Sequence, residues 1–366
     1  MIHNRDMITE RPAPKSVIGP IAWLRANLFN GPINSLFTLI GLYIVYLLFV
    51  PSVQWAFINA DWIGTSRDDC SREGACWVFV NARIGQFIYG LYPSEETWRA
   101  NIIFAGFFAL IAWLAIPRLP FKRWVAIFAL VAFPVIAYVL LHGGYFGLER
   151  IPTNRWGGLM LTLLLATVGM IAALPIGIML ALGRRSDMPI VRSFCVVFIE
   201  FWRGVPLITI LFMASVMLPL FLPGDMNIDR LVRALIGITL FQSAYMAEVI
   251  RGGLQAIPKG QEEAAAALGM TYWKRMGLIV LPQALKMMIP GIVNTFISLF
   301  KDTTLVMIIG LFDLLGIVQA ALSDSRWLGF SLEGYVFAAF MFWVFCFSMS
   351  RYSQYLERKL HTGHRN

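Results

Sequence analysis

Long apolar runs separated by short polar segments dominate this sequence. A helix that crosses the hydrocarbon core of a bilayer needs roughly 20 mainly apolar residues, and eight runs approach or exceed that length. They lie near 34–53, 101–117, 124–142, 157–182, 194–221, 231–249, 288–311 and 334–353. The pattern therefore predicts an all-α, polytopic membrane protein with about eight transmembrane helices.

The polar segments divide the chain unequally. We expect an N-terminal tail at 1–33, three spans in 34–155 with an outer loop at about 54–99, a core of five spans in 156–356, and a C-terminal tail at 357–366. The first three spans contain no recurring polar motif, whereas polar residues enter the later spans. Function is therefore expected in the second part of the chain.

Composition and charge agree with a membrane protein. Hydrophobic residues make up 58% of the chain and charged residues 14%, whereas soluble domains are about 25% charged. If the N-terminus lies in the cytoplasm, most of the 30 Lys and Arg residues fall in cytoplasmic segments, as the positive-inside rule requires. The net charge of +9 thus reflects topology and not nucleic-acid binding, and we expect both termini in the cytoplasm.

The cysteines and histidines give little sign of metal chemistry. Cys195 and Cys346 fall in spans, where we expect them to pack as small hydrophobic residues. Cys70 and Cys76 lie in the outer loop, where a disulfide could persist, and the sequence leaves their pairing open. Three of the four histidines lie in polar tails, and no metal-ligand spacing occurs, so we expect no metal site.

One loop, at about 251–286, is unusually long and regular. Pro258 and Gly260 predict a turn, and the acidic residues that follow favour the start of a helix. Ala264 to Ala267 form a strongly helix-favouring run, which Gly269 should end. Such small side chains allow close approach by a cleft of another protein, although a connector lying on the membrane surface explains the helix equally well.

The same loop resembles the EAA signature of binding-protein-dependent ABC importer permeases. Glu263-Ala264-Ala265, three residues, Gly269, nine residues and then Ile279-Val280-Leu281-Pro282 match every defined position. The segments FIEFWRGVPLI (198–208), QSAYMAEVIRGGLQAIPKGQ (242–261) and NTFISLFKDTTLV (294–306) are similar to the polar amino-acid branch of that family. The layout of the first three spans is similar to one permease of the general L-amino-acid importers.

This resemblance implies a fold and a function. The fold is a type I ABC importer permease core of five helices preceded by three extra helices, in a bacterial inner membrane. The function is that of the permease subunit of an ATP-driven amino-acid importer, which forms the translocation pathway and couples to ATPase subunits through a coupling helix at about 257–272. The ATPase-coupling residues that the resemblance implies are Pro258, Gly260, Glu262, Glu263, Ala264, Ala265, Gly269, Leu281 and Pro282.

The chain contains no GxxxxGK[ST] motif, so a different polypeptide must bind the nucleotide. We therefore expect a transport subunit that is not itself an enzyme and that holds no cofactor, with ATP and Mg bound by a partner ATPase. The resemblance implies two cytoplasmic ABC ATPase subunits and a second, related permease, with a heterodimer favoured over a homodimer. It also implies a periplasmic amino-acid-binding protein, an amino-acid substrate and membrane lipid as partners.

Polar residues inside the spans suggest a path for the substrate. An amino acid carries an ammonium and a carboxylate, so its path needs groups of both signs. Glu200 and Arg203 supply both, although three residues apart they could simply form a structural salt bridge. Gly204 and Pro206 should break the helix and free backbone groups. Further candidates are Gln242, Ser243 and Asn294, which could be interhelical hydrogen-bonders, and Lys301, Asp302 and Thr303.

The start of the seventh span decides where the last of these residues lie. A start near Met288 keeps Lys286 at the headgroups and puts Pro290 in the first turn, where its missing N–H costs least. Lys301 and Asp302 then lie about halfway across, where an ionisable pair usually faces a cavity or a partner. The alternative is that the two neutralise each other within a packed bundle.

Two other classes of function and one further pair of residues stay open. An ion-coupled secondary transporter of small zwitterionic solutes would use carboxylates inside the membrane as ion sites and would need no motor. An intramembrane enzyme would need a nucleophile with its base, and the spans offer no convincing pair.

Tyr245 and Glu248, near the cytoplasmic end of the sixth span, fit a gate or a structural role equally well.

Overall fold

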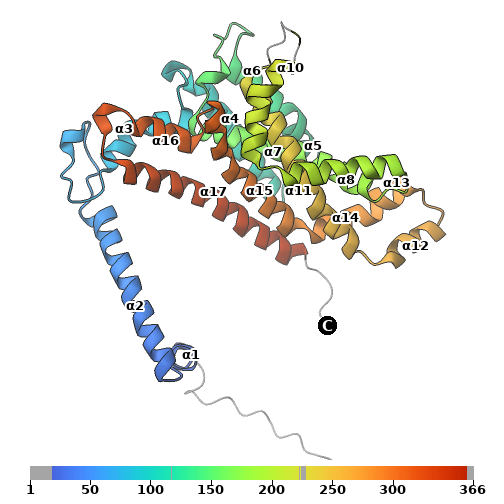
Figure 1. The fold of residues 1–366 in the computed structure, drawn as a ribbon, viewed down its shortest axis with the longest axis horizontal. Coiled ribbons are helices and arrows are strands. Elements are labelled where there is room, and N and C mark those ends of the chain that lie inside the picture. The colour runs from blue at the N-terminus through green and yellow to red at the C-terminus, as the bar shows by residue number, and fades with distance from the viewer. Residues whose placement is uncertain (1–18, 117, 222, 224–227, 361–366) are drawn as a thin grey trace, which may run out of the picture. The chain divides into compact units, whose positions relative to one another are not determined.

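The structure is a computed structural model that describes residues 19–116, 118–221, 223 and 228–360. These residues are almost entirely helical, with isolated β-bridges and no β-strand among them, which confirms the all-α prediction (Figure 1). The chain forms two compact units, Met1–Val78 and Phe79–Asn366. Residues 1–18 and 361–366 of the two expected tails lie outside the described part.

The first unit contains one long apolar helix. After the short helix α1 (Pro20–Asn27), helix α2 (Pro32–Val53) continues into the π-helical segment η1 (Gln54–Ile58). Together they form a 27-residue apolar helix, long enough to cross a membrane. Within the first unit no α2 side chain is buried.

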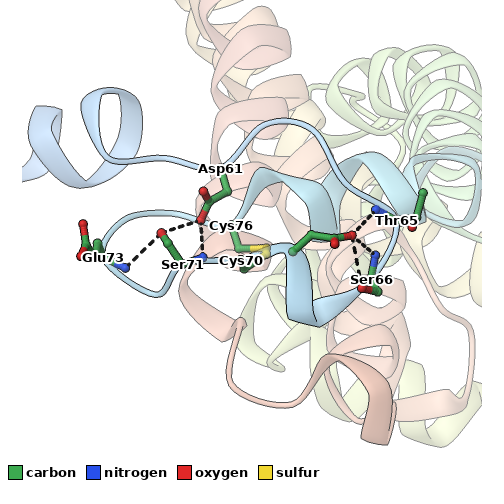
Figure 2. Close-up of a disulfide and its surroundings, with 8 residues drawn as sticks. Asp61, Thr65, Ser66, Cys70, Ser71, Glu73 and Cys76 are labelled. Carbon is green, nitrogen blue, oxygen red and sulfur yellow. Dashed lines mark hydrogen bonds between the residues drawn. A yellow bond between two sulfur atoms is a disulfide. The ribbon is translucent and has the colours of Figure 1, made fainter.

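A compact loop follows this helix, and a disulfide joins Cys70 to Cys76 in it (Figure 2). The Asp61 carboxylate accepts hydrogen bonds from the backbone N–H and hydroxyl of Ser71, at 2.8 and 2.9 Å. Asp69, in the 3₁₀ turn η2 (Arg67–Asp69), accepts from the backbone N–H groups of Thr65 and Ser66. These donors stabilise the charged form and lower the pKa of Asp69.

Three helices precede the core, the first of which begins in the last two residues of the first unit. They are α3 (Trp77–Tyr89), α4 (Thr97–Ala115), which follows the short turn η3 (Ser94–Glu96), and the continuous helix made by α5 (Lys122–Ile127), η4 (Phe128–Ala132) and α6 (Phe133–His142). Ser94–Ala115 and Lys122–His142 are long and apolar enough to span a membrane. They match the second and third expected spans.

The core is built on two long helices that run parallel. Helix α7 (Gly158–Arg184), preceded by the turn η5 (Thr153–Arg155), packs along its length against α11 (Arg230–Ala256). Small residues make this packing close: a Cβ added at Gly177 would lie 2.8 Å from the Cβ of Met246. Such small residues let helices approach closely in membranes, where van der Waals contact drives association.

The expected span 194–221 is a broken helix in the structure. Helix α8 (Pro189–Gly204) ends before Pro206, and the chain resumes as α9 (Leu207–Phe212), η6 (Met213–Met217) and α10 (Leu218–Phe221), bent by 100° from α8. The break predicted from Gly204 and Pro206 is confirmed. The span is therefore not one straight helix across the bilayer.

The remaining chain contains the loop helices and the last two expected spans. The elements are α12 (Lys259–Ala267), α13 (Tyr272–Arg275), η7 (Met276–Val280), α14 (Leu281–Met287), α15 (Ile289–Asp302), η8 (Thr303–Ile309), α16 (Leu314–Leu322), η9 (Ser325–Trp327) and α17 (Ser331–Leu360). Helix α15 begins at Ile289, directly after Met288, with Pro290 in its first turn. The predicted start of this span is confirmed.

The number of spans differs from the prediction. Six helices of the described residues are long and apolar enough to cross a membrane, or seven if the bent pair counts as one span, so the predicted eight is not confirmed. The missing member is α11, which carries Arg230, Arg233, Glu248 and Arg251. Its 27 residues extend about 40 Å, which is long enough to cross.

Candidate functional site

Helix α12 is the centre of the segment expected to couple to another protein. It runs from Lys259 to Ala267, inside the expected 257–272, with Pro258 as the residue before its first turn. Gly269 ends it in the left-handed conformation, at φ 74°, and the N–H of Met270 donates to the carbonyl of Ala265. This is the glycine-based termination expected from the sequence.

The two sides of α12 differ in exposure. Ala265 is buried on one side of α12. The helix packs against η7, whose Met276 and Val280 belong to an apolar cluster with residues of α7, α8, α11 and α14. Gly260, Glu263 and Ala264 are exposed on the other side. Beyond the helix end, Leu268 is 82% exposed and Trp273 73% exposed. Two large apolar side chains are therefore exposed directly after α12.

An ion pair and a hydrogen bond connect α12 and the end of α11 to the end of α7. The guanidinium of Arg185 lies 3.5 Å from the carboxylate of Glu262 and donates to the backbone carbonyl of Leu254, also at 3.5 Å. These contacts connect α12 to the residue that directly follows the last turn of α7. Leu281 and Pro282 begin α14, with Leu281 packed against the same apolar cluster and Pro282 exposed.

Glu248 is the hub of a charged network at this end of the core. Its carboxylate accepts from Arg184 at 2.6 Å and from Arg251 at 2.8 to 3.2 Å, and lies 3.9 Å from Arg203. Arg184 also donates to Glu200 at 3.1 Å. The Glu248 side chain is 16% exposed, whereas that of Glu200 is 56% exposed. The network joins α7, α8 and α11 through charge-assisted hydrogen bonds.

The direct salt bridge considered between Glu200 and Arg203 is not present. Glu200 pairs with Arg184 instead, and Arg203 faces Glu248 and stacks over the ring of Tyr245, with 5.6 Å from the guanidinium carbon to the ring centroid. Spacing on one helix suggested that pair, but both side chains turn to neighbouring helices. Gly204 and Pro206 are exposed at the helix break beside this network.

The polar residues expected deeper in the spans are mostly engaged within the protein. The buried amide of Gln242 donates to the backbone carbonyl of Thr295 at 2.7 Å, which joins α11 to α15. The Ser243 hydroxyl, also buried, donates to the carbonyl of Leu240 in its own helix. Asn294 is exposed. The interhelical alternative thus describes Gln242, whereas Asn294 presents a free polar surface.

Lys301 and Asp302 lie at the end of α15, where the α-helix passes into the 3₁₀ segment η8. Within the described part of the chain neither side chain forms an ion pair within 4.0 Å, so the mutual neutralisation considered from sequence is not observed. Lys301 is exposed and Asp302 half-buried. Thr303 is buried and donates to the carbonyl of Phe300.

Sequence reasoning gave too little weight to Arg184, Arg185 and Arg251. It counted these residues only among the Lys and Arg that set the topology, whereas the structure places Arg184 against Glu248 and Arg185 against Glu262. The missing signal is long-range pairing between helices, which no local spacing reveals. The described residues contain no group of three or more His, Cys, Asp or Glu that could hold a metal ion.

These features define a membrane-transport protein: apolar spans, a broken helix beside a charged network, and an exposed helix connected to the spans by an ion pair. Residues 173–362 match the family described as "Binding-protein-dependent transport system inner membrane component", and the chain belongs to this family. It is therefore a multi-span protein of the inner membrane. Membership of this family gives no support to ion-coupled secondary transport.

Several relatives are similar over most or part of the chain. The "Inner membrane amino-acid ABC transporter permease protein YhdY" of Escherichia coli is 57% identical over 96% of this chain and 96% of its own length. The "Glutamate/glutamine/aspartate/asparagine transport system permease protein BztC" of Rhodobacter capsulatus is 40% identical over 98% of each chain. A solved structure, "Crystal structure of an amino acid ABC transporter with histidines", aligns with a TM-score of 0.49 and 32% identity over 55% of this chain and 92% of that one.

Proposed function

We propose that this chain is the permease subunit of an ATP-driven amino-acid importer and that α12 is its coupling helix. The observation that carries the proposal is α12 itself, a short alanine-rich helix with Ala265 buried on one side and with Leu268 and Trp273 exposed next to it. The printed names of the relatives, which are amino-acid transport permeases, support the substrate class.

The proposal includes an orientation and a set of partners. α12 lies on the cytoplasmic side with both termini, and two cytoplasmic ATPase subunits bind ATP and Mg. A second, related permease completes the pathway as a heterodimer, and a periplasmic amino-acid-binding protein delivers the substrate. This chain contributes no cofactor and no catalytic residue.

The contacts around α12 suggest how ATPase motion reaches the spans. A displacement of α12 moves Glu262 and, through it, Arg185 at the end of α7. The adjacent Arg184 bridges Glu248 of α11 and Glu200 of α8, just before the helix break. Rearrangement of these ion pairs opens and closes the inner end of the path, and the two states have different affinities for the substrate.

Candidate substrate contacts lie beside this network. Arg203 and Glu200 offer both charges, and the break at Gly204 and Pro206 leaves backbone groups without helical partners. Asn294, Lys301 and Asp302 are further candidates on α15. Helix packing is the role we assign to Gln242, Ser243 and Thr303, because their side chains already donate hydrogen bonds to backbone carbonyls.

ATP-dependent uptake in vesicles that contain the complete transporter tests the coupling role. We expect Glu263→Lys and Gly269→Trp to leave the complex inserted but to separate ATP hydrolysis from uptake, because both change the exposed side of the loop. Gly269→Ala is the matched control: it carries the same left-handed strain, about 1 kcal/mol, without the bulk. It should retain most of the uptake.

Other results would contradict the proposal. Unchanged uptake by Gly269→Trp shows that no tightly fitting partner surrounds this loop. Purification of the chain without any ATPase subunit, together with uptake driven by an ion gradient, would assign a different class of transporter.

A further inference from the structure

A basic cavity lies at the end of the core opposite to α12. It has a volume of about 420 Å³ and is lined by Arg150, Arg230 and Arg233, by Asp229, by neutral residues of the segment before α7 and by Leu311. Arg230 and Glu248 lie about 27 Å apart along α11, at about 1.5 Å per residue. The cavity and the Glu248 network therefore occupy the two ends of the same helix.

Within the part of the chain that the structure describes, the three guanidinium groups of this cavity have no carboxylate partner. Among the described residues no Asp or Glu oxygen lies within 4.0 Å of Arg150, Arg230 or Arg233. The Asp229 carboxylate accepts instead from the hydroxyl of Thr153, at 2.6 Å, and from the N–H of Leu231. The lining thus has three positive charges and one negative charge.

Arg233 gives a second, independent indication of a ligand. It is only 8% exposed, and one terminal nitrogen donates to the carbonyl of Ser215. Its buried Nε has no hydrogen-bond partner among the described residues. An unpaired charge away from water is costly, so a buried guanidinium normally meets an anion. A guanidinium also matches a carboxylate in a bidentate geometry.

We propose that this cavity is an entry site for a dicarboxylic amino acid such as L-glutamate. Its two carboxylates pair with the arginines, and its ammonium group pairs with Asp229. The volume lies within the range of small-molecule sites. A neutral amino acid supplies one carboxylate to the three guanidinium groups where a dicarboxylic amino acid supplies two, so it binds more weakly. The inference rests on the proposed import of amino acids and extends it to a charge class.

A reporter cysteine in the cavity tests the proposal without any transport measurement. Asn154 lines the cavity and is exposed. In the detergent-purified complex, with Cys195→Ser and Cys346→Ser, we expect Asn154→Cys to react faster with a negatively charged methanethiosulfonate than with a positively charged one. L-glutamate should slow the reaction severalfold, and L-glutamine, which is nearly isosteric but neutral, should not.

Charge variants then identify the groups responsible. Arg233→Gln should lower the ratio of anionic to cationic reaction rates about tenfold and abolish protection by L-glutamate, because interactions between charges are several times stronger near a protein than in bulk water. Arg155→Gln removes an exposed charge close to the reporter but outside the cavity lining, so it should change the ratio about twofold at most. Pro152→Cys is a second reporter position in the same lining.

Each of the following four outcomes would overturn the proposed dicarboxylate site. Equal protection by L-glutamate and L-glutamine excludes charge selection, and absence of protection at both reporter positions excludes a dicarboxylate site. Protection by the binding protein without amino acid assigns the cavity to receptor docking, and protection only by phosphatidylglycerol assigns it to a lipid headgroup. Because none of these results depends on ATP-driven uptake, they are distinguishable from failure of the proposed function.

Discussion

Glu248→Gln is the substitution that best tests the charged network. The neutral amide keeps the size of the side chain but removes the carboxylate that faces Arg184, Arg203 and Arg251. Three guanidinium groups then lie together with only Glu200 to balance them. An exposed pair contributes about 0–1 kcal/mol and breaking a buried pair costs about 3–5 kcal/mol. At 16% exposure, Glu248 lies between these cases, and we expect a loss of about 2 kcal/mol.

Glu200→Gln is the matched control for this prediction. It neutralises a carboxylate of the same network, but one that is 56% exposed and that contacts a single guanidinium at 3.1 Å. We expect a loss of about 0.5 kcal/mol, as for other exposed pairs. Thermal unfolding of the detergent-purified complex measures both, and the Glu248 variant should unfold several degrees below the Glu200 variant.

A double substitution separates the hub from a general effect of charge. Arg184→Gln combined with Glu248→Gln removes one guanidinium together with the carboxylate that holds it. The two losses should therefore be less than additive. Equal destabilisation by Glu200→Gln and Glu248→Gln would refute the reasoning, because exposure and number of contacts would then play no part. Strict additivity of the double variant would refute it as well.

Three further predictions concern other parts of the molecule. Arg203→Ala should weaken amino-acid uptake in vesicles while the complex still assembles, and loss of assembly would instead indicate a structural salt bridge. Cys70→Ser should destabilise the loop at 59–76 by only about 2 kcal/mol, because the disulfide closes a short loop. Faster proteolysis within 59–76 would measure this loss. Arg326 holds the pKa of Asp324 at about 2, well below its ordinary value. This contribution to stability is complete above a pH of about 4 and declines as the pH falls toward 2, so the difference in Tm between the parent and Asp324→Asn should narrow below pH 4.

The sequence alone predicted the features that depend on local chemistry. Apolar runs of sufficient length indicated the helices, because in a bilayer every backbone polar group must be paired within its own segment. Gly204 and Pro206 predicted the break in the fifth span, and Pro290 predicted the start of the seventh. The left-handed end of α12 also followed from a single residue, Gly269, since few other residues adopt that conformation without strain.

Only the tertiary structure decided which charges meet. Glu200 and Arg203 are three residues apart, yet they bind Arg184 and Glu248 on other helices, because the packing of α7 against α11 brings these side chains closer. The basic cavity likewise joins Arg150 to Arg233, which lie far apart in the sequence. Residue spacing describes neighbours on one helix, whereas pairing between helices depends on how each is rotated and packed. The sequence therefore determined where most of the long apolar helices and the loop helix lie, and packing determined the network and the cavity.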